Sequence, residues 1–142
     1  MLGVIFSLIA GAAMSFQGVM NTRLGEKTGL FEGNLYVQGT AFLLSIVAFL
    51  IMREKGFAEL SGVPKPYLLG GVLGLVITVS VMLGIKGLSP TISISIILIA
   101  QLLVAGLIDT FGLLGAEKQP LIWQRIAGLA LMIGGMLLVK HK

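Results

Sequence analysis

Five long apolar stretches separated by short polar connections dominate the pattern of this chain. They cover about residues 2–21, 34–52, 67–88, 90–111 and 121–139. A helix needs roughly 20 mostly apolar residues to cross the hydrocarbon core of a bilayer, which is about 30 Å thick. Each stretch has or nearly has that length. The pattern therefore predicts an all-α, polytopic membrane protein with five transmembrane helices in each subunit.

Short polar segments connect the five stretches. Residues 23–33 combine charges with glycines, which predicts a turn-rich loop, and the longest connection, residues 53–66, holds charges and two prolines. Before the fourth stretch, Ser89 is placed to act as the N-cap and Pro90 as the first helical residue. No connection is long enough to fold as a soluble domain, so we expect residues 1–142 to form a single integral membrane domain.

Composition supports this interpretation and excludes several classes of protein. The chain is 56% hydrophobic and 11% charged, whereas ordinary globular domains carry roughly 25% charged residues. The absence of cysteine excludes disulfide scaffolds, zinc fingers and cysteine nucleophiles. The net charge of +4 is not gathered into a strip that could bind nucleic acid. The sequence has no Ser-His-Asp set, metal-ligand cluster or phosphate loop, so we expect neither an enzyme nor a bound metal or cofactor.

Positive charges are divided evenly between the two expected membrane faces, five against five. The first set is Arg53, Lys55, Lys65, Lys118 and Arg125, and the second is Arg23, Lys27, Lys86, Lys140 and Lys142. Because orientation follows the Lys and Arg bias, the even division favours insertion of copies in both orientations. The alternative is a single orientation fixed by the N-terminus or by the insertion machinery. Opposite copies would pair as an antiparallel homodimer with a two-fold axis in the membrane plane.

Several segments have a distinctive order of residues. Ala13 to Gly25 reads AMSFQGVMNTRLG, and the fourth stretch contains Ile99-Ala100-Gln101-Leu102-Leu103 followed by Leu107-Ile108-Asp109-Thr110-Phe111-Gly112. The segments Gly70–Gly74 and Arg125–Gly135 add glycine patterns. Through these segments the chain resembles the short YdcZ-like proteins of the drug/metabolite transporter superfamily. The resemblance implies a five-helix unit that forms half of a ten-helix transporter fold, and it implies little about the substrate.

Amide side chains within the spans are informative because lipid offers them no hydrogen bond. Gln17 and Asn21 lie four residues apart and share a helix face, and Gln101 lies near the middle of its span. Each of these amides either bonds to a neighbouring helix or lines a solute pathway. Gln38, on the second span, is a further candidate for the pathway.

Asp109 is the acidic residue that lies well inside a predicted span. It is either solvated near the membrane face or paired with Lys118, or it serves as a proton-coupling or cation-binding carboxylate. In an antiparallel pair, Asp109 of one copy would lie at the depth of Gln17 and Asn21 of the other. We therefore predict a cavity shared by two copies and lined by these three residues and Gln101.

Small residues recur at every fourth position along three spans. They include Gly11 and Ser15 in the first, Gly70 and Gly74 in the third, and Gly134 in the fifth. Small residues let membrane helices approach closely, so these positions are expected to pack against other helices. The same spacing also suits helices that slide during transport.

The leading hypothesis is a transporter of a small polar or cationic metabolite or drug that works by alternating access, with proton coupling at Asp109 as one form. Its class rests on the family resemblance and its dimeric form on the charge distribution. The alternatives are a passive small-solute or ion channel and a non-transporting membrane partner subunit. The expected location is the bacterial plasma (inner) membrane. The expected partners are the lipid bilayer, a small-molecule substrate and a second copy of the chain in inverted orientation.

Overall fold

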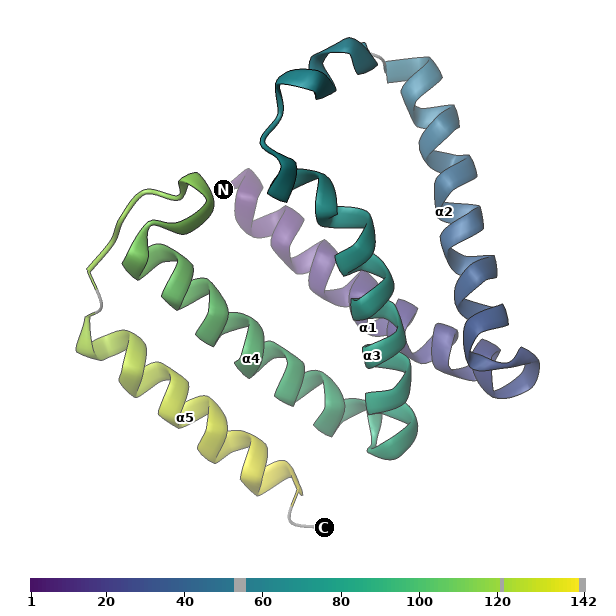
Figure 1. The fold of residues 1–142 in the computed structure, drawn as a ribbon. Helices are drawn as coiled ribbons and strands as arrows, with labels where there is room; N and C mark the ends of the chain where they lie inside the picture. The colour runs from purple at the N-terminus through teal and green to yellow at the C-terminus, as the bar shows by residue number, and fades with distance from the viewer. Residues whose placement is uncertain (53–55, 121, 141–142) are drawn as a thin grey trace. The chain divides into compact units, whose positions relative to one another are not determined.

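The structure is all helical in the part of the chain that it describes. The computed structural model covers residues 1–52, 56–120 and 122–140. Its α-helices are α1 (Leu2–Thr28), α2 (Leu30–Met52), α3 (Gly70–Gly87), α4 (Pro90–Phe111) and α5 (Trp123–Lys140) (Figure 1). Short 3-10 helices lie in the connections at Phe57–Gly62, Lys65–Leu69 and Leu113–Gly115. Each α-helix, α3 counted with the 3-10 helix before it, is long and apolar enough to cross a membrane. The prediction of five membrane-spanning helices is therefore confirmed.

The first helix is longer than the apolar pattern predicts, and the predicted loop over residues 23–33 is wrong. Arg23 and Glu26 form an ion pair of 2.9 Å on the extended part of α1, and such a pair stabilises a helix. The chain breaks only at Gly29, whose φ of +106° is one that glycine adopts without strain. Because α2 begins directly afterwards, at Leu30, Asn34 lies in the second turn of α2. The sequence predicts it at the start of that helix.

The start of α3 differs from the prediction, whereas the start of α4 agrees with it. The sequence predicts the third helix from residue 67, but the chain first forms a 3-10 helix, and α3 starts at Gly70. Pro66 lies in the first turn of this 3-10 helix, where its missing N–H group costs no hydrogen bond. At α4, Ser89 is the N-cap, and its side-chain oxygen accepts a hydrogen bond from the Ile92 N–H at 3.4 Å. The predicted roles of Ser89 and Pro90 are confirmed.

The chain divides into two compact units, Met1–Gly87 and Leu88–Lys142. The first unit contains α1, α2 and α3, which all contact one another. The second contains α4 and α5, which pack along each other with a small groove of about 170 Å³ between them. The prediction of a single integral membrane domain stays a prediction.

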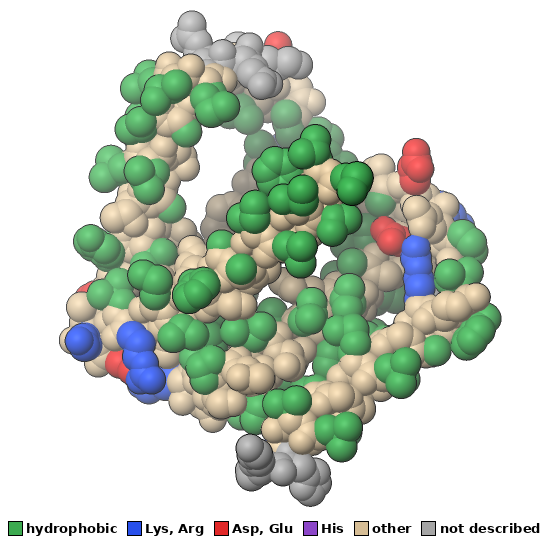
Figure 2. All heavy atoms as spheres, turned by 180° about the vertical axis from the view of Figure 1, so that it is seen from behind, with side chains coloured by type: hydrophobic (Ala, Val, Ile, Leu, Met, Phe, Trp, Pro, Cys, Tyr) green, Lys and Arg blue, Asp and Glu red, His purple; other side chains and the backbone are tan. Residues whose placement is uncertain are grey.

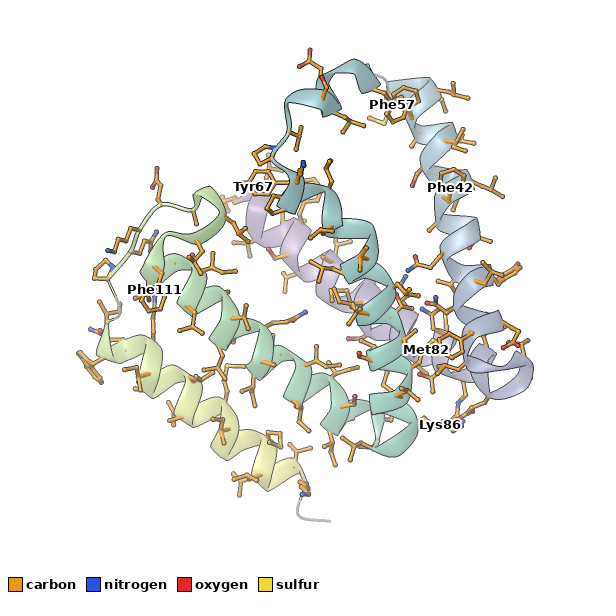
Figure 3. The ribbon with its side chains drawn as sticks, in the orientation of Figure 1. Phe42, Phe57, Tyr67, Met82, Lys86 and Phe111 are labelled. Atoms are coloured by element: carbon orange, nitrogen blue, oxygen red, sulfur yellow. The ribbon has the colours of Figure 1, made fainter. Side chains whose placement is uncertain are left out.

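Within the first unit, α1 packs on α3 through glycines that leave room for larger side chains. A methyl group at Gly18 would lie 3.0 Å from Ile85 and 3.1 Å from Val81. One at Gly25 would lie 2.5 Å from the Cε atom of Met82. Met82 is the most deeply buried side chain, 2% exposed (Figure 3). The glycines therefore let the C-terminal part of α1 lie against that of α3.

The turn between α1 and α2 is equally close. A methyl group at Gly33 would lie 3.1 Å from the Cα atom and 3.2 Å from the backbone nitrogen of Gly25. Backbone atoms cannot rotate away as a side chain does. The end of α1 and the start of α2 can therefore lie this close only because Gly33 has no side chain.

Apolar side chains cover the outside of the helices. Among the described residues, Met82, Ile85 and Ile99 are the buried hydrophobic ones, and most other large apolar side chains are exposed. Figure 2 shows hydrophobic side chains over the helices and charged ones grouped near helix ends and connections. Such a surface is stable against lipid and not against water, because large apolar patches are rare on soluble proteins.

A substitution at Gly33 tests the junction of α1 and α2. We expect Gly33→Ala to lower stability by about 1–3 kcal/mol, because the added methyl group forces backbone atoms apart. Thermal unfolding of the protein in detergent micelles measures the effect. Gly39→Ala is the matched control on the same helix, since no described atom outside the local helix lies within 4 Å of the added methyl group there. Equal melting temperatures for the two variants would contradict the close contact.

Candidate functional site

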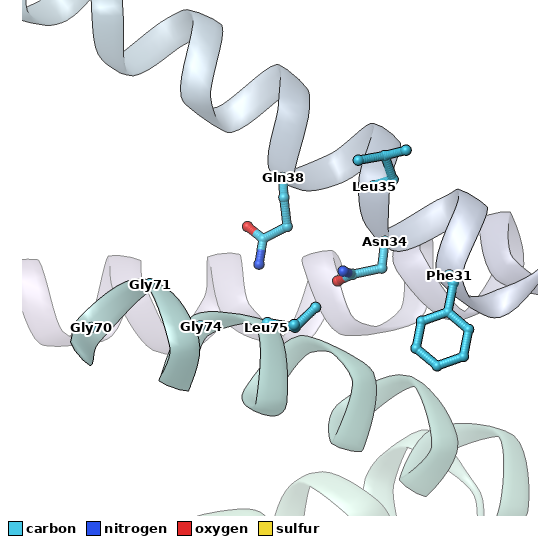
Figure 4. A pocket seen from close by; sticks show the side chains of 8 residues that line it. All are labelled: Phe31, Asn34, Leu35, Gln38, Gly70, Gly71, Gly74 and Leu75. Atoms are coloured by element: carbon cyan, nitrogen blue, oxygen red, sulfur yellow. The ribbon is translucent and has the colours of Figure 1, made fainter.

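A groove of about 770 Å³ opens between α2 and α3 in the first unit. Its lining from α2 is Phe31, Asn34, Leu35 and Gln38, and its lining from α3 is Gly70, Gly71, Gly74 and Leu75 (Figure 4). No described atom outside the local helix lies within 4 Å of a methyl group placed at Gly70 or Gly71. Gly70, which the sequence predicts to pack against another helix, therefore forms an open wall of this groove together with Gly71, whereas a methyl group at Gly74 would lie 3.8 Å from the Gln38 Nε2 atom.

Gln38 bridges the two helices beside the groove. Its side-chain N–H donates to the hydroxyl oxygen of Thr78 at 3.5 Å, and the Thr78 hydroxyl donates to the Gly74 carbonyl at 2.7 Å. Because Thr78 uses its own proton on Gly74, the hydroxyl oxygen is free to accept from Gln38. This orients the amide and leaves the Gln38 Oε1 atom without a hydrogen bond to any described residue.

Asn34 is the most unusual polar residue of the site. It is 4% exposed, and its Oδ1 atom is buried without a hydrogen-bond partner. In Figure 4 the side chains of Asn34 and Gln38 both extend from α2 toward α3. A buried acceptor without a partner costs about 1–3 kcal/mol, so such a group in a native structure is expected to bind a water, an ion or a ligand.

The apolar pattern does not reveal Asn34 as a site residue, because it places Asn34 at the start of the second span. There an asparagine is an ordinary interfacial or capping residue. A usable signal was present, however. Asn34 lies four residues before Gln38 and thus on the same face of a helix that begins earlier.

The predicted pathway residues of α1 have different environments. Asn21 is 7% exposed and belongs to the buried part of α1 together with Thr22, whereas Gln17 is exposed. The groove contains Gln38, Gly70 and Gly74 but neither Gln17 nor Asn21. The structure thus brings together only some of the residues that the sequence analysis singled out.

Gln101 and Asp109 both lie on α4, in the second unit. Gln101 is exposed, and Asp109 is partly exposed near the end of the helix. The cavity that we predict between two copies, lined by these residues with Gln17 and Asn21, stays a prediction. So does a proton-coupling role for Asp109.

The cation beside Asp109 is Arg125 and not Lys118. The Arg125 Nη1 atom lies 3.4 Å from Asp109 Oδ2, and the Nη2 atom donates to Gln119 Oε1 at 2.7 Å. The Gln119 backbone N–H also donates to the Asp109 carbonyl at 2.8 Å. This last bond turns the connection back along α4 and brings the start of α5 beside Asp109. With side chains 35% and 42% exposed, the ion pair contributes at most about 1 kcal/mol in water.

Other charges of the predicted faces lie near helix ends. Lys27, Lys86 and Lys140 lie in the last turns of α1, α3 and α5, where a cation interacts favourably with the helix dipole. Arg53, Lys55 and Lys142, which also enter the count of charges, lie outside the described residues.

The remaining candidates for helix packing lie at open surfaces of the single subunit. No described residue lies within 4 Å of a methyl group placed at Gly11 or Gly134, and the Ser15 hydroxyl donates to the Gly11 carbonyl at 3.0 Å. Packing of these positions against another chain stays a prediction.

Comparison with known protein families gives one match that covers most of the chain. The profile of the family described as "Putative inner membrane exporter, YdcZ" matches residues 2–138, which is nearly the whole chain. None of the curated proteins and none of the solved structures compared with the chain matches it.

A substitution of Asn34 tests whether its amide stabilises the fold. We expect Asn34→Leu, which keeps the number and branching of the side-chain heavy atoms and removes the unpaired acceptor, to raise stability by about 1–2 kcal/mol. Thr78→Val is the matched control, because it removes the partner of Gln38 and should lower stability by about 0.6 kcal/mol. Thermal unfolding in detergent micelles measures both. A loss of stability in Asn34→Leu would show that the amide is bonded within the fold.

Proposed function

Since the chain belongs to the YdcZ family of inner membrane exporters, we propose that it moves a small polar or cationic solute across the inner membrane by alternating access, as a pair of inverted copies. Membership of the family makes it an integral inner membrane protein and a transporter in general terms, a class distinct from enzymes. The substrate class, the mechanism and the pairing are our proposal.

The observation that carries the proposal is the placement of amides on helices that cross lipid. Gln17 on α1 and Gln101 on α4 are exposed in the single subunit, although both helices are apolar enough to span the membrane. Lipid cannot satisfy these amides. A second copy that covers them would supply hydrogen bonds or enclose them in a wet solute pathway.

The even charge distribution supports an inverted arrangement of that second copy. Five spans place the two ends of the chain on opposite sides of the membrane, and the Lys and Arg residues favour neither side. Two inverted copies of a five-helix unit have the symmetry of transporters built from inverted repeats, in which one half moves against the other around a central site.

Asp109 supports coupling of transport to a cation or proton. Its carboxylate already has Arg125 as a partner at 3.4 Å, so a proton or cation that binds to Asp109 competes with the guanidinium group. Competition of this kind links binding at the end of α4 to the position of the first turn of α5, where Arg125 lies. A two-state contact of this type is what alternating access requires.

Cysteine labelling tests the inverted pairing, because the native chain contains no cysteine. Gly62→Cys and Lys27→Cys place one exposed thiol on each expected membrane face. With dual insertion, a membrane-impermeant maleimide added to spheroplasts should label about half of the copies at each position. Full labelling of one position and none of the other would contradict dual insertion.

Transport measured in proteoliposomes tests the coupling. Vesicles loaded with a pH-sensitive dye receive benzyltrimethylammonium or benzamide on the outside, and a coupled carrier changes the internal pH. We expect Asp109→Asn and Gln101→Ala to abolish the change and Asp109→Glu to retain part of it, since the exchangeable carboxylate is kept. Glu117→Gln is the control, an acid-to-amide change in the connection after α4. Wild-type signals from both Asp109→Asn and Gln101→Ala would contradict the proposed pathway.

A further inference from the structure

We propose that the groove between α2 and α3 binds a neutral solute that presents an N–H or O–H donor on an apolar body. The inference rests on the proposed transport function and assigns it a binding site and a substrate class. It starts from Asn34, whose buried Oδ1 atom has no partner in the part of the chain that the structure describes. An acceptor in that condition gains a full hydrogen bond when a donor arrives, without giving up one that it already has.

Gln38 supplies a second acceptor on the same side of α2. Its N–H group is used by Thr78, which fixes the amide with Oε1 unbonded. Asn34 and Gln38 are one helical turn apart, and Figure 4 shows both side chains reaching toward α3. The two oxygens therefore favour a ligand with hydrogen-bond donors over one that offers only acceptors.

The absence of charge in the lining selects a neutral ligand. None of the eight lining residues is acidic or basic. A full charge placed there would lose hydration without gaining a counter-ion, which is strongly unfavourable next to lipid. A neutral amide or hydroxyl loses much less on entering and recovers it through the two amide oxygens.

The rest of the lining fits an apolar body. Phe31, Leu35 and Leu75 supply apolar side chains, and the open glycine wall of α3 lets a flat ring approach the helix backbone. The volume, about 770 Å³, is within the range of about 300–1,000 Å³ that small-molecule sites have. Because Oδ1 is covered, a donor reaches it when the Asn34 side chain rotates toward the groove.

Asparagine-selective NMR tests the site directly. The chain has only two asparagines, Asn21 and Asn34, so protein in lipid nanodiscs with ¹³C at the side-chain carbonyl gives two signals, which Asn34→Asp assigns. The probes are benzamide, N,N-dimethylbenzamide, which has the same ring but no N–H donor, and benzylammonium, which has donors and a charge. We expect benzamide to shift the Asn34 signal saturably, to leave Asn21 unmoved, and to bind about tenfold more tightly than either other probe.

Each other outcome overturns a stated part of the inference. Equal binding of N,N-dimethylbenzamide would remove the donor requirement, and tighter binding of benzylammonium would remove the preference for a neutral solute. No saturable shift with any probe would remove the site. The maleimide labelling and the internal-pH assay test the proposed transport function independently of the NMR titration. If the titration fails while both of these assays succeed, the binding site in the groove is rejected and the transport function is not.

Steric variants keep the test informative if the amides are also needed for folding. Gly71→Leu fills the groove from α3 and should abolish the benzamide shift, since no described atom lies within 4 Å of a methyl group placed there. Gly39→Leu is the matched control, because it adds the same side chain at a position on α2 with equally open space outside the groove lining. Unchanged benzamide binding in Gly71→Leu, or an equal loss in Gly39→Leu, would contradict the location.

Discussion

Hydrocarbon offers no hydrogen bonds, and this constraint explains where the polar atoms of the chain lie. Most hydroxyl groups on the spanning helices are satisfied within their own helix: Ser15, Thr22 and Thr110, for example, each donate to the carbonyl oxygen four residues earlier. Charged groups are found at helix ends or paired, as Asp109 is with Arg125. The Oδ1 atom of Asn34 is the described buried side-chain atom that departs from this pattern. In a chain with so few polar groups, that departure is the strongest structural indication of a binding site.

Close packing at one end of the first unit explains why a groove can open beside Asn34. Gly25 and Gly33 hold α1 against α2, and Gly18 and Gly25 admit Ile85 and Met82 of α3. From this junction α2 and α3 diverge toward the connection between them (Figure 1). The space between the diverging helices is bridged at Gln38 and Thr78, and glycines form much of its wall on α3. Glycines on α1 and α2 thus pack the helices tightly at one end, and other glycines, on α3, leave room for a ligand farther along.

The number of helices could be predicted from the sequence because it depends on local hydropathy, and the start of α4 because a serine followed by a proline is a local signal. The extent of α1 could not, since Glu26 and Lys27 suit an exposed helix end as well as a loop. The pairing of Asp109 with Arg125 depends on how the connection folds back through Gln119, which no spacing in the sequence reveals. The unpaired state of Asn34 is harder still to predict, because none of the three helices of the first unit places a hydrogen-bond donor beside its Oδ1 atom.

We propose that the chain keeps an unsatisfied amide in its membrane-embedded part because a transported solute satisfies it. The most direct measurement is uptake of labelled benzamide into proteoliposomes by wild-type protein and by Asn34→Leu, reconstituted at equal amounts. The account predicts saturable uptake by the wild type and loss of most of that uptake in Asn34→Leu. Uptake by Asn34→Leu at the wild-type rate and half-saturation would contradict the claim.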